Sequence, residues 1–283
     1  DLMENHLIHA GIFLAANLKN SDLWGEYNYL ANRTDYSIRF DRKVLNQDLD
    51  YDYSQRIRFN RIEVKALYPF NLRHKLAISG TYSLSRAIDQ INFRTPESVM
   101  GFAGIKSEYQ FDNTLHVEEN LQEGQRVWAS AEFQKSTIQS GGYVKLKLDA
   151  RKYISITNWL YFFGRFSAAH NVKVGALDVL PQTILGGMDN WLFQTRESRT
   201  TENPLGTNGI AQRDVFMSDF AGNLRGFGVN KMSGNSHLLL NLELHIPVKK
   251  LVSQDQERSQ FLNNLQLVGF TDIGSAWTGS SPF

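Results

Sequence analysis

Histidine and serine are residue types that could do chemistry in this chain, and their spacing decides whether they can. Seven histidines suggest a metal site. His237 and His245 share the polar face of one predicted strand, but they stand about 27 Å apart along it, too far for one ion. His6 and His9 fall on opposite faces of another strand. The spacing therefore predicts no metal site, and no cofactor is expected.

The same geometry argues against nucleophilic catalysis. Ser236 and His237 are adjacent in "NSHLLL", but adjacent residues of a strand point to opposite faces and cannot form a dyad. Motifs of nucleophile elbows, phosphate-binding loops and zinc proteases do not occur in the sequence. We expect no enzymatic activity. The net charge of +1 gives no field that attracts nucleic acid, and the basic stretch "KLKLDARK" (Lys145–Lys152) alternates like the wet face of a strand.

The elements that must hold these residues are β-strands. Period-two alternation of apolar and polar residues is widespread, and helical periodicity is hard to find. In "SHLLLNLELHIPV" (236–248), for example, six aliphatic residues share one face, and His237, Asn241 and Glu243 lie on the other. We predict eleven strands of roughly 8–14 residues each. Their approximate positions are 6–18, 23–30, 35–44, 55–68, 73–87, 98–112, 125–136, 142–155, 158–169, 236–248 and 262–277.

The length and polarity of these segments predict an all-β fold, a transmembrane antiparallel barrel with up-and-down topology. Soluble strands are mostly about 5–6 residues long, whereas a tilted strand needs about 9–11 residues to cross a bilayer. The polar faces carry charged residues along whole strands and must therefore be in contact with water. Closing the sheet, with lipid outside and water inside, satisfies every backbone group and removes the edges. A soluble β-sandwich is the alternative.

Composition agrees with an envelope protein. The chain has no cysteine, so disulfides and thiolate zinc sites are impossible, and it has no apolar run of the roughly 18 residues that a membrane helix requires. Because it begins at Asp1 without a leader pattern, we expect an interior or processed segment. The short connections "KNSD" (Lys19–Asp22) and "SGG" (Ser140–Gly142) contrast with a long polar one, as short periplasmic turns contrast with long external loops.

Three motifs toward the C-terminal end occur in a telling order: "NLRGF" (Asn223–Phe227), a strand ending in "LELHIPV" (Leu242–Val248), and "LVGFTDIGSAW" (Leu267–Trp277). Together with "WLYFFGRFSAA" (Trp159–Ala169), this part of the chain resembles the BamA-type outer-membrane barrel superfamily, the surface-antigen barrel domain. The resemblance implies a barrel of sixteen strands, of which this chain would hold about eleven, incomplete at both ends. It also implies that residues 171–235 form a long external loop that folds into the lumen of a single partial barrel domain, residues 1–283.

The resemblance further implies a latch at the tip of this loop. The predicted latch residues are Arg225, Gly226, Phe227 and Asp272, and the supporting lumen residues are Glu243, Phe270 and Gly274. In the family the loop arginine pairs with the acid of the F-x-D-x-G strand, and a guanidinium is suited to paired bonds with a carboxylate. Gly226 and Gly228 would allow close approach and positive φ, Phe227 would be an apolar anchor, and Glu243 is a second possible partner. The alternative is an ordinary lumenal salt bridge that only stabilises.

For function, the resemblance implies a barrel in the outer membrane of a Gram-negative-type bacterium that inserts, assembles or exports other proteins. Two alternatives stay open: a plugged barrel that anchors or completes a larger envelope or secretion complex, and a passive porin. The expected partners are outer-membrane lipids, client outer-membrane or secreted proteins, and periplasmic or lipoprotein subunits of a complex.

Overall fold

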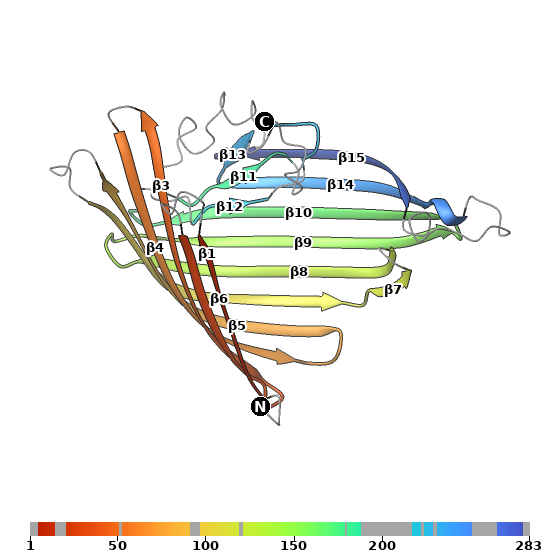
Figure 1. The fold of residues 1–283 in the computed structure, drawn as a ribbon, viewed down its shortest axis with the longest axis horizontal. Helices are drawn as coiled ribbons and strands as arrows, with labels where there is room; N and C mark the ends of the chain where they lie inside the picture. Colours follow the sequence, from red (N-terminus) through yellow and green to blue (C-terminus); the bar gives the residue numbers. More distant parts are fainter. Residues whose placement is uncertain are drawn as a thin grey trace.

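One antiparallel sheet dominates the computed structural model of the chain (Figure 1). The structure describes residues 5–14, 21–50, 53–90, 97–118, 121–178, 180–187, 217–221, 224–228, 231–250 and 265–279. Eleven strands follow one another across the sheet: β1 (His6–Leu14), β2 (Ser21–Tyr29), β3 (Asp35–Asp50), β4 (Tyr53–Pro69), β5 (His74–Asp89), β6 (Ser98–Asp112), β8 (Leu121–Ser136), β9 (Gly142–Thr157), β10 (Leu160–Val174), β14 (Ser236–Pro247) and β15 (Gln266–Trp277). Short β7 (Leu115–Glu118) pairs with β8, and a single 3-10 turn, η4 (Val248–Lys250), follows β14. The predicted all-β meander is confirmed.

The strands are longer than the alternation predicted. β3 to β6 and β8 to β10 hold 15–17 residues each. At ~3.3 Å per residue, sixteen residues extend over about 53 Å, which exceeds the ~30 Å hydrocarbon core even for a tilted strand. These strands are therefore longer than a bilayer crossing requires, and the sequence pattern underestimated their length.

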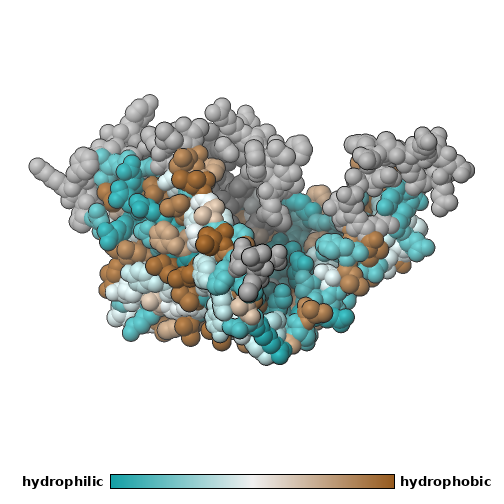
Figure 2. All heavy atoms as spheres, turned by 60° about the horizontal axis from the view of Figure 1, so that its bottom comes forward, coloured by the Kyte–Doolittle hydropathy of each residue, from teal (hydrophilic) through white to brown (hydrophobic). Residues whose placement is uncertain are grey.

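The strand register collects the apolar residues on one face. Ile105 pairs with Phe133 across β6 and β8, and Leu240 pairs with both Phe166 of β10 and Ile273 of β15. Leu240 is half-buried and the other side chains are exposed, Ile105 and Ile273 each at 64%. Figure 2 shows hydrophobic residues on the outer surface and hydrophilic residues in the hollow inside the sheet. Such an apolar exterior fits a hydrocarbon environment.

The sheet curves but does not close. β1 and β15 are its two edges, and within the described residues they do not pair with each other. Figure 1 shows β1 to β4 running steeply and β8, β9, β10, β14 and β15 running level, so that the sheet bends strongly between the two groups. Within the described residues the expected closed cylinder is thus an open, curved wall.

The connection between β10 and β14 contains a small sheet of its own. Its strands are β11 (Thr183–Leu185), β12 (Asp219–Phe220) and β13 (Met232–Gly234), in the order β12-β11-β13. β10 extends to Val174, so the loop begins after that residue and not at 171 as predicted. Residues 188–216, in the middle of the predicted loop, lie outside the described part of the chain.

The predicted division between short turns and long loops is wrong for the turn at "SGG". Val174, where the long loop leaves β10, pairs with Gly142 at the start of β9, and Gly142 also pairs with Lys135 near the end of β8. The short β8–β9 turn therefore lies at the same end of the sheet as the long loop. "KNSD" falls partly outside the described residues. No helix in the described part of the chain is long and apolar enough to cross a membrane.

Candidate functional site

The tip of the long loop lies against the inner wall, where Arg225 contacts acidic residues of two neighbouring strands. Nε of Arg225 donates to Oδ2 of Asp272 on β15 at 2.7 Å, and Nη2 donates to Oδ1 at 2.6 Å. This is the paired geometry of a planar guanidinium on a carboxylate. The remaining nitrogen, Nη1, donates to Oε1 of Glu243 on β14 at 2.6 Å. Every guanidinium nitrogen therefore has a carboxylate partner.

Asp272 is the centre of this contact. Its side chain is 1% exposed. Besides the two guanidinium bonds, it accepts a bond from the backbone N of Arg225 at 2.9 Å and one from Nδ2 of Asn241 at 2.8 Å. A buried carboxylate is stable only when it is paired and hydrogen-bonded. Without the guanidinium, two neutral donors would be left to hold this charge.

The period-two geometry of the strands brings these groups together. Asn241 pairs with Asp272 and Glu243 pairs with Phe270 in the β14–β15 register, so all four share the inner face. The ring of Phe270 lies beside the guanidinium, with Cζ of Arg225 3.9 Å from the ring centroid. The arginine therefore makes two ion pairs and one cation–π contact.

The apolar anchor of the loop tip is Leu224, and the prediction that Phe227 fills this role is wrong. Leu224 is fully buried and clusters with Leu185 of β11 and Leu239 of β14. Phe227 is 48% exposed. Gly274 on β15 makes room for this cluster, because a Cβ there would lie 3.0 Å from Leu185 Cδ2 and 3.1 Å from Leu239 Cδ1.

Of the two properties predicted for the loop glycines, positive φ is confirmed at Gly226, and close approach to the wall is wrong for both glycines. Gly226 has φ of 87°, which residues with a side chain rarely adopt. A Cβ at Gly226 or at Gly228 would meet nothing within 4 Å, and Gly228 does not have positive φ. Gly226 therefore turns the chain after Arg225, and the close approach to the wall occurs at Gly274.

A second contact, which the sequence did not predict, holds the loop at Asp219. Its Oδ1 lies 2.6 Å from Nζ of Lys147, and its Oδ2 lies 3.0 Å from Nζ of Lys145, both on the inner face of β9. Burial alone would raise the pKa of the Asp219 carboxyl, but the two ammonium groups outweigh burial and hold that pKa below its usual value. The signal in the sequence was "KLK", which places two lysines on one polar face where they require an acidic partner.

The small sheet connects the two contacts. β11 pairs with β12, and the backbone N of Asp219 donates to Gln182 O at 2.9 Å while that of Ala221 donates to Ile184 O at 2.8 Å. Just beyond β11, Gly187 forms a bridge with Leu224, next to Arg225. The carboxylate of Asp219 and the guanidinium of Arg225 thus belong to one hydrogen-bonded unit that lies on the inner wall.

Comparison with solved structures identifies the architecture. BamA from Haemophilus ducreyi lacking POTRA domains 1–3 is similar, with a TM-score of 0.64 and 11% sequence identity over 92% of this chain and 50% of that one. CdiB from Acinetobacter baumannii has a TM-score of 0.50 and 11% identity over 91% of this chain and 40% of that one. The chain has the fold of a BamA-type barrel. No protein-family model and no curated protein sequence matches it.

The similarity to the BamA-type barrel concerns the fold, because sequence identity is low. The chain spans half or less of the length of these two structures.

A serine–histidine pair does occur in the described residues, although it is not the adjacent pair Ser236 and His237. Oγ of Ser167 on β10 lies 3.1 Å from Nε2 of His237 on β14. Ser236 instead contacts His170, at 2.6 Å. Because Ser167 and His237 are only 7% and 4% exposed, the pair is closed to substrate. The described residues contain no cluster of three metal-ligating side chains.

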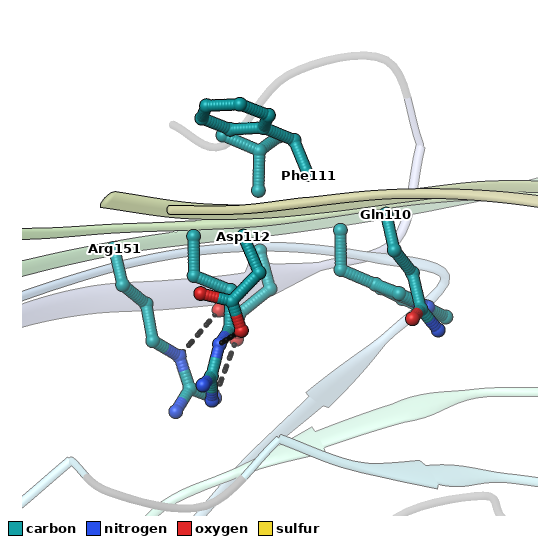
Figure 3. A pocket seen from close by; sticks show the side chains of 8 residues that line it. Gln110, Phe111, Asp112 and Arg151 are labelled. Carbon is teal, nitrogen blue, oxygen red and sulfur yellow. Dashed lines mark hydrogen bonds and ion pairs between the residues drawn. The ribbon is translucent and has the colours of Figure 1, made fainter. Parts of the chain in front are cut away.

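A cavity of about 460 Å³ lies beside β6, β8 and β9. Figure 3 shows Gln110, Asp112 and Arg151 on one side of the sheet and Phe111 on the other, as strand alternation requires. Asp112 is bonded to Arg126 at 2.7 Å, and Asp149 to Arg151 at 2.7 Å. The charged side chains that line this cavity are therefore paired with one another, as expected for a polar inner wall, and none of these four is left to bind a ligand.

Proposed function

We propose that this chain is the barrel wall of a BamA-like protein in the outer membrane of a Gram-negative-type bacterium, and that it inserts, assembles or exports other proteins without enzymatic chemistry. The loop clasped by Arg225 would plug the lumen and set the conformation of the wall. Its partners would be outer-membrane lipids, client outer-membrane or secreted proteins, and periplasmic or lipoprotein subunits.

The observation that carries this proposal is the contact of Arg225 with Asp272, Glu243 and Phe270. A loop that only covered an opening would not need an enclosed ion pair to the last two strands of the sheet. Because the contact joins the loop to both β14 and β15, its release can change the conformation of this part of the wall. Client folding would supply the driving force.

Arg39 provides a matched control for Arg225. It also pairs with two carboxylates, Asp41 at 2.8 Å and Glu26 at 3.2 Å, and its Cζ lies 5.0 Å from the Trp24 ring. All four residues belong to β2 and β3, however, so this cluster joins wall to wall. Arg39→Ala removes a similar set of contacts without releasing the loop.

In the experiment, the chromosomal gene is replaced by a version that encodes either Arg225→Ala or Arg39→Ala, and a separate strain is depleted of the full-length protein. The outer membrane of each strain is then analysed by quantitative proteomics. Assembly or export predicts loss of several unrelated outer-membrane or secreted proteins on depletion and in Arg225→Ala, with a smaller effect in Arg39→Ala. Loss of only the subunits of one complex would support an anchoring role and contradict the proposal.

Conductance of the purified full-length protein in planar bilayers separates both roles from a passive porin. A plugged barrel conducts little and opens more often when Arg225 is replaced. A large, steady conductance of the unaltered protein would show a porin and exclude the plug.

A further inference from the structure

A small cavity, which we call the loop cavity, lies between the long loop and the inner wall. Its volume is about 120 Å³, and it is lined by residues 217–219 of the loop and by side chains of β4, β5, β6, β8 and β9. Thr81 and Ser83 of β5 contribute only short hydroxyl side chains to this lining. Nζ of Lys145 joins the loop to the wall, because it donates to Met217 O at 3.3 Å and contacts Asp219 at 3.0 Å.

Charged side chains of both signs line the loop cavity: Arg61, Lys106, Lys145, Lys147, Glu132 and Asp219. The wall adds two acids, because Glu63 pairs with Arg61 at 2.7 Å and Glu108 pairs with Lys106 at 2.8 Å. Lys65 lies 3.8 Å from Glu108 and adds a further cation. Asp41, opposite Arg61 in the register, is bonded to Arg39 at 2.8 Å. The surrounding charges are close to balance, so net charge alone does not select a ligand.

The excess in the loop cavity is one of hydrogen-bond donors. A guanidinium carries five N–H groups and an ammonium carries three. Among the described residues, Arg61 donates through Nη2 to Glu63, and Lys147 donates to Asp219, so most of their N–H groups have no acceptor. Lys145 and Lys147 also share the single carboxylate of Asp219. An oxyanion, whose oxygens accept several charge-assisted bonds at once, fits this set of donors.

One buried acceptor narrows the choice of oxyanion. Gln134 lines the loop cavity and is 3% exposed, and its Oε1 has no hydrogen-bond partner among the described residues. The amide orientation is fixed, because Nε2 donates to Oγ1 of Thr81 and to Oε1 of Glu132, and a rotated amide would turn its oxygen toward that carboxylate. A buried carbonyl oxygen without a donor is costly. The loop cavity therefore fits an oxyanion that also carries a hydroxyl group.

We propose that the loop cavity binds a small hydroxyl-bearing oxyanion, of which inorganic phosphate is the simplest. Its oxygens accept bonds from Arg61, Lys106 and Lys147, and its hydroxyl donates to Oε1 of Gln134. The small volume suits a free ion and excludes the body of a lipid or a nucleotide. Because the ion lies between the loop and the wall, it stabilises the docked loop. The proposal goes beyond the proposed function and does not depend on it.

The first experiment is equilibrium dialysis of the purified full-length protein in detergent with radiolabelled phosphate or sulfate at neutral pH. Sulfate has a similar shape but no hydroxyl at this pH, so it leaves Oε1 of Gln134 without a donor. Because a hydrogen bond to a charged group is lost, we expect sulfate to bind about tenfold more weakly than phosphate. Gln134→Met keeps the length of the side chain without the acceptor and should abolish this preference.

Equal binding of phosphate and sulfate by the unaltered protein would overturn the proposal, and so would an unchanged preference in Gln134→Met. Glycerol phosphate distinguishes a free ion from a phosphate group carried by a larger molecule. It should bind more weakly than inorganic phosphate, because the loop covers the ion. Equal binding of the two would overturn the assignment to a free ion.

Lys106 and Lys65 provide a matched pair of variants. Both contact Glu108, at 2.8 Å and 3.8 Å, but of the two only Lys106 lines the loop cavity. Lys106→Gln should weaken phosphate binding about tenfold through the loss of a charge-assisted bond, whereas Lys65→Gln should bind like the unaltered protein. Equal effects of the two substitutions would overturn the proposal.

Hydrogen–deuterium exchange tests whether the ion lies under the loop. An ion that binds only the docked loop slows exchange through loop opening about a hundredfold at a concentration of a hundred times its Kd. The amides of Asp219 and Ala221 report on the loop, and amides in the middle of β10 serve as the control. Phosphate binding without slower exchange at the loop amides would place the ion elsewhere and overturn the proposal. Failure to bind phosphate leaves the proposed function intact, because the proteomic experiment does not involve the ion.

Discussion

Replacing Arg225 by alanine tests whether the enclosed ion pairs hold the loop on the wall. The substitution removes two bonds to Asp272, one bond to Glu243 and the contact with the Phe270 ring. Removing one partner of a buried pair costs about 3–5 kcal/mol. We expect the lower end of this range, because Asp272 keeps its bonds to Asn241 and to the backbone N of residue 225.

Hydrogen–deuterium exchange of the full-length protein measures this loss where it should occur. The amides of Asp219 and Ala221 are bonded within the small sheet and report whether that sheet stays ordered. A loss of about 3 kcal/mol corresponds to exchange faster by more than a hundredfold. Amides in the middle of β9 should be unchanged, because the wall does not depend on the loop for its backbone bonds.

A double-mutant cycle with Asp272→Asn shows whether the effect comes from the pair itself. Asp272→Asn removes the buried charge, so the double variant should be better protected than Arg225→Ala alone. The reasoning is refuted if Arg225→Ala speeds loop exchange no more than the wall control Arg39→Ala. The reasoning is also refuted if the effects of Arg225→Ala and Asp272→Asn on loop-amide exchange simply add in the double variant.

Three pairs of substitutions, each a test with its comparison, probe the other contacts of the loop, with loop-amide exchange as the common readout. Leu224→Ala should cost about 2–5 kcal/mol because this side chain is fully buried, whereas Phe227→Ala should have little effect because Phe227 is half exposed. Gly274→Ala should cost about 1–3 kcal/mol through overpacking against Leu185 and Leu239, while Gly269→Ala on the same strand, where a Cβ meets nothing, should be tolerated. Asp219→Asn should loosen β12 more than Lys147→Met does, because it leaves two enclosed lysines without a carboxylate; equal effects would contradict the two-lysine contact.

The strands and their faces could be predicted from the sequence. Every one of the eleven alternating segments corresponds to a strand of the main sheet, since period two is imposed by the backbone wherever one face is apolar and the other wet. The register then follows, because a slip of one residue would move every polar side chain to the apolar face of the sheet. The proximity of Arg225 and Asp272 came from a resemblance of motifs, not from alternation, which places Asp272 on a face but does not place the loop.

Alternation could not predict contacts of the loop, where the chain has no period. That Leu224 and not Phe227 is the apolar anchor depends on how the chain turns at Gly226, and the contact of Asp219 with Lys145 and Lys147 joins residues more than seventy positions apart. The curvature of the wall accumulates over the whole sheet and is not visible in any one strand. The sequence by itself thus determined which side of each strand is apolar, because that choice is local and repeats every two residues. Only the tertiary structure decided what lies inside the wall, because a loop without periodicity is positioned by the sum of its distant contacts.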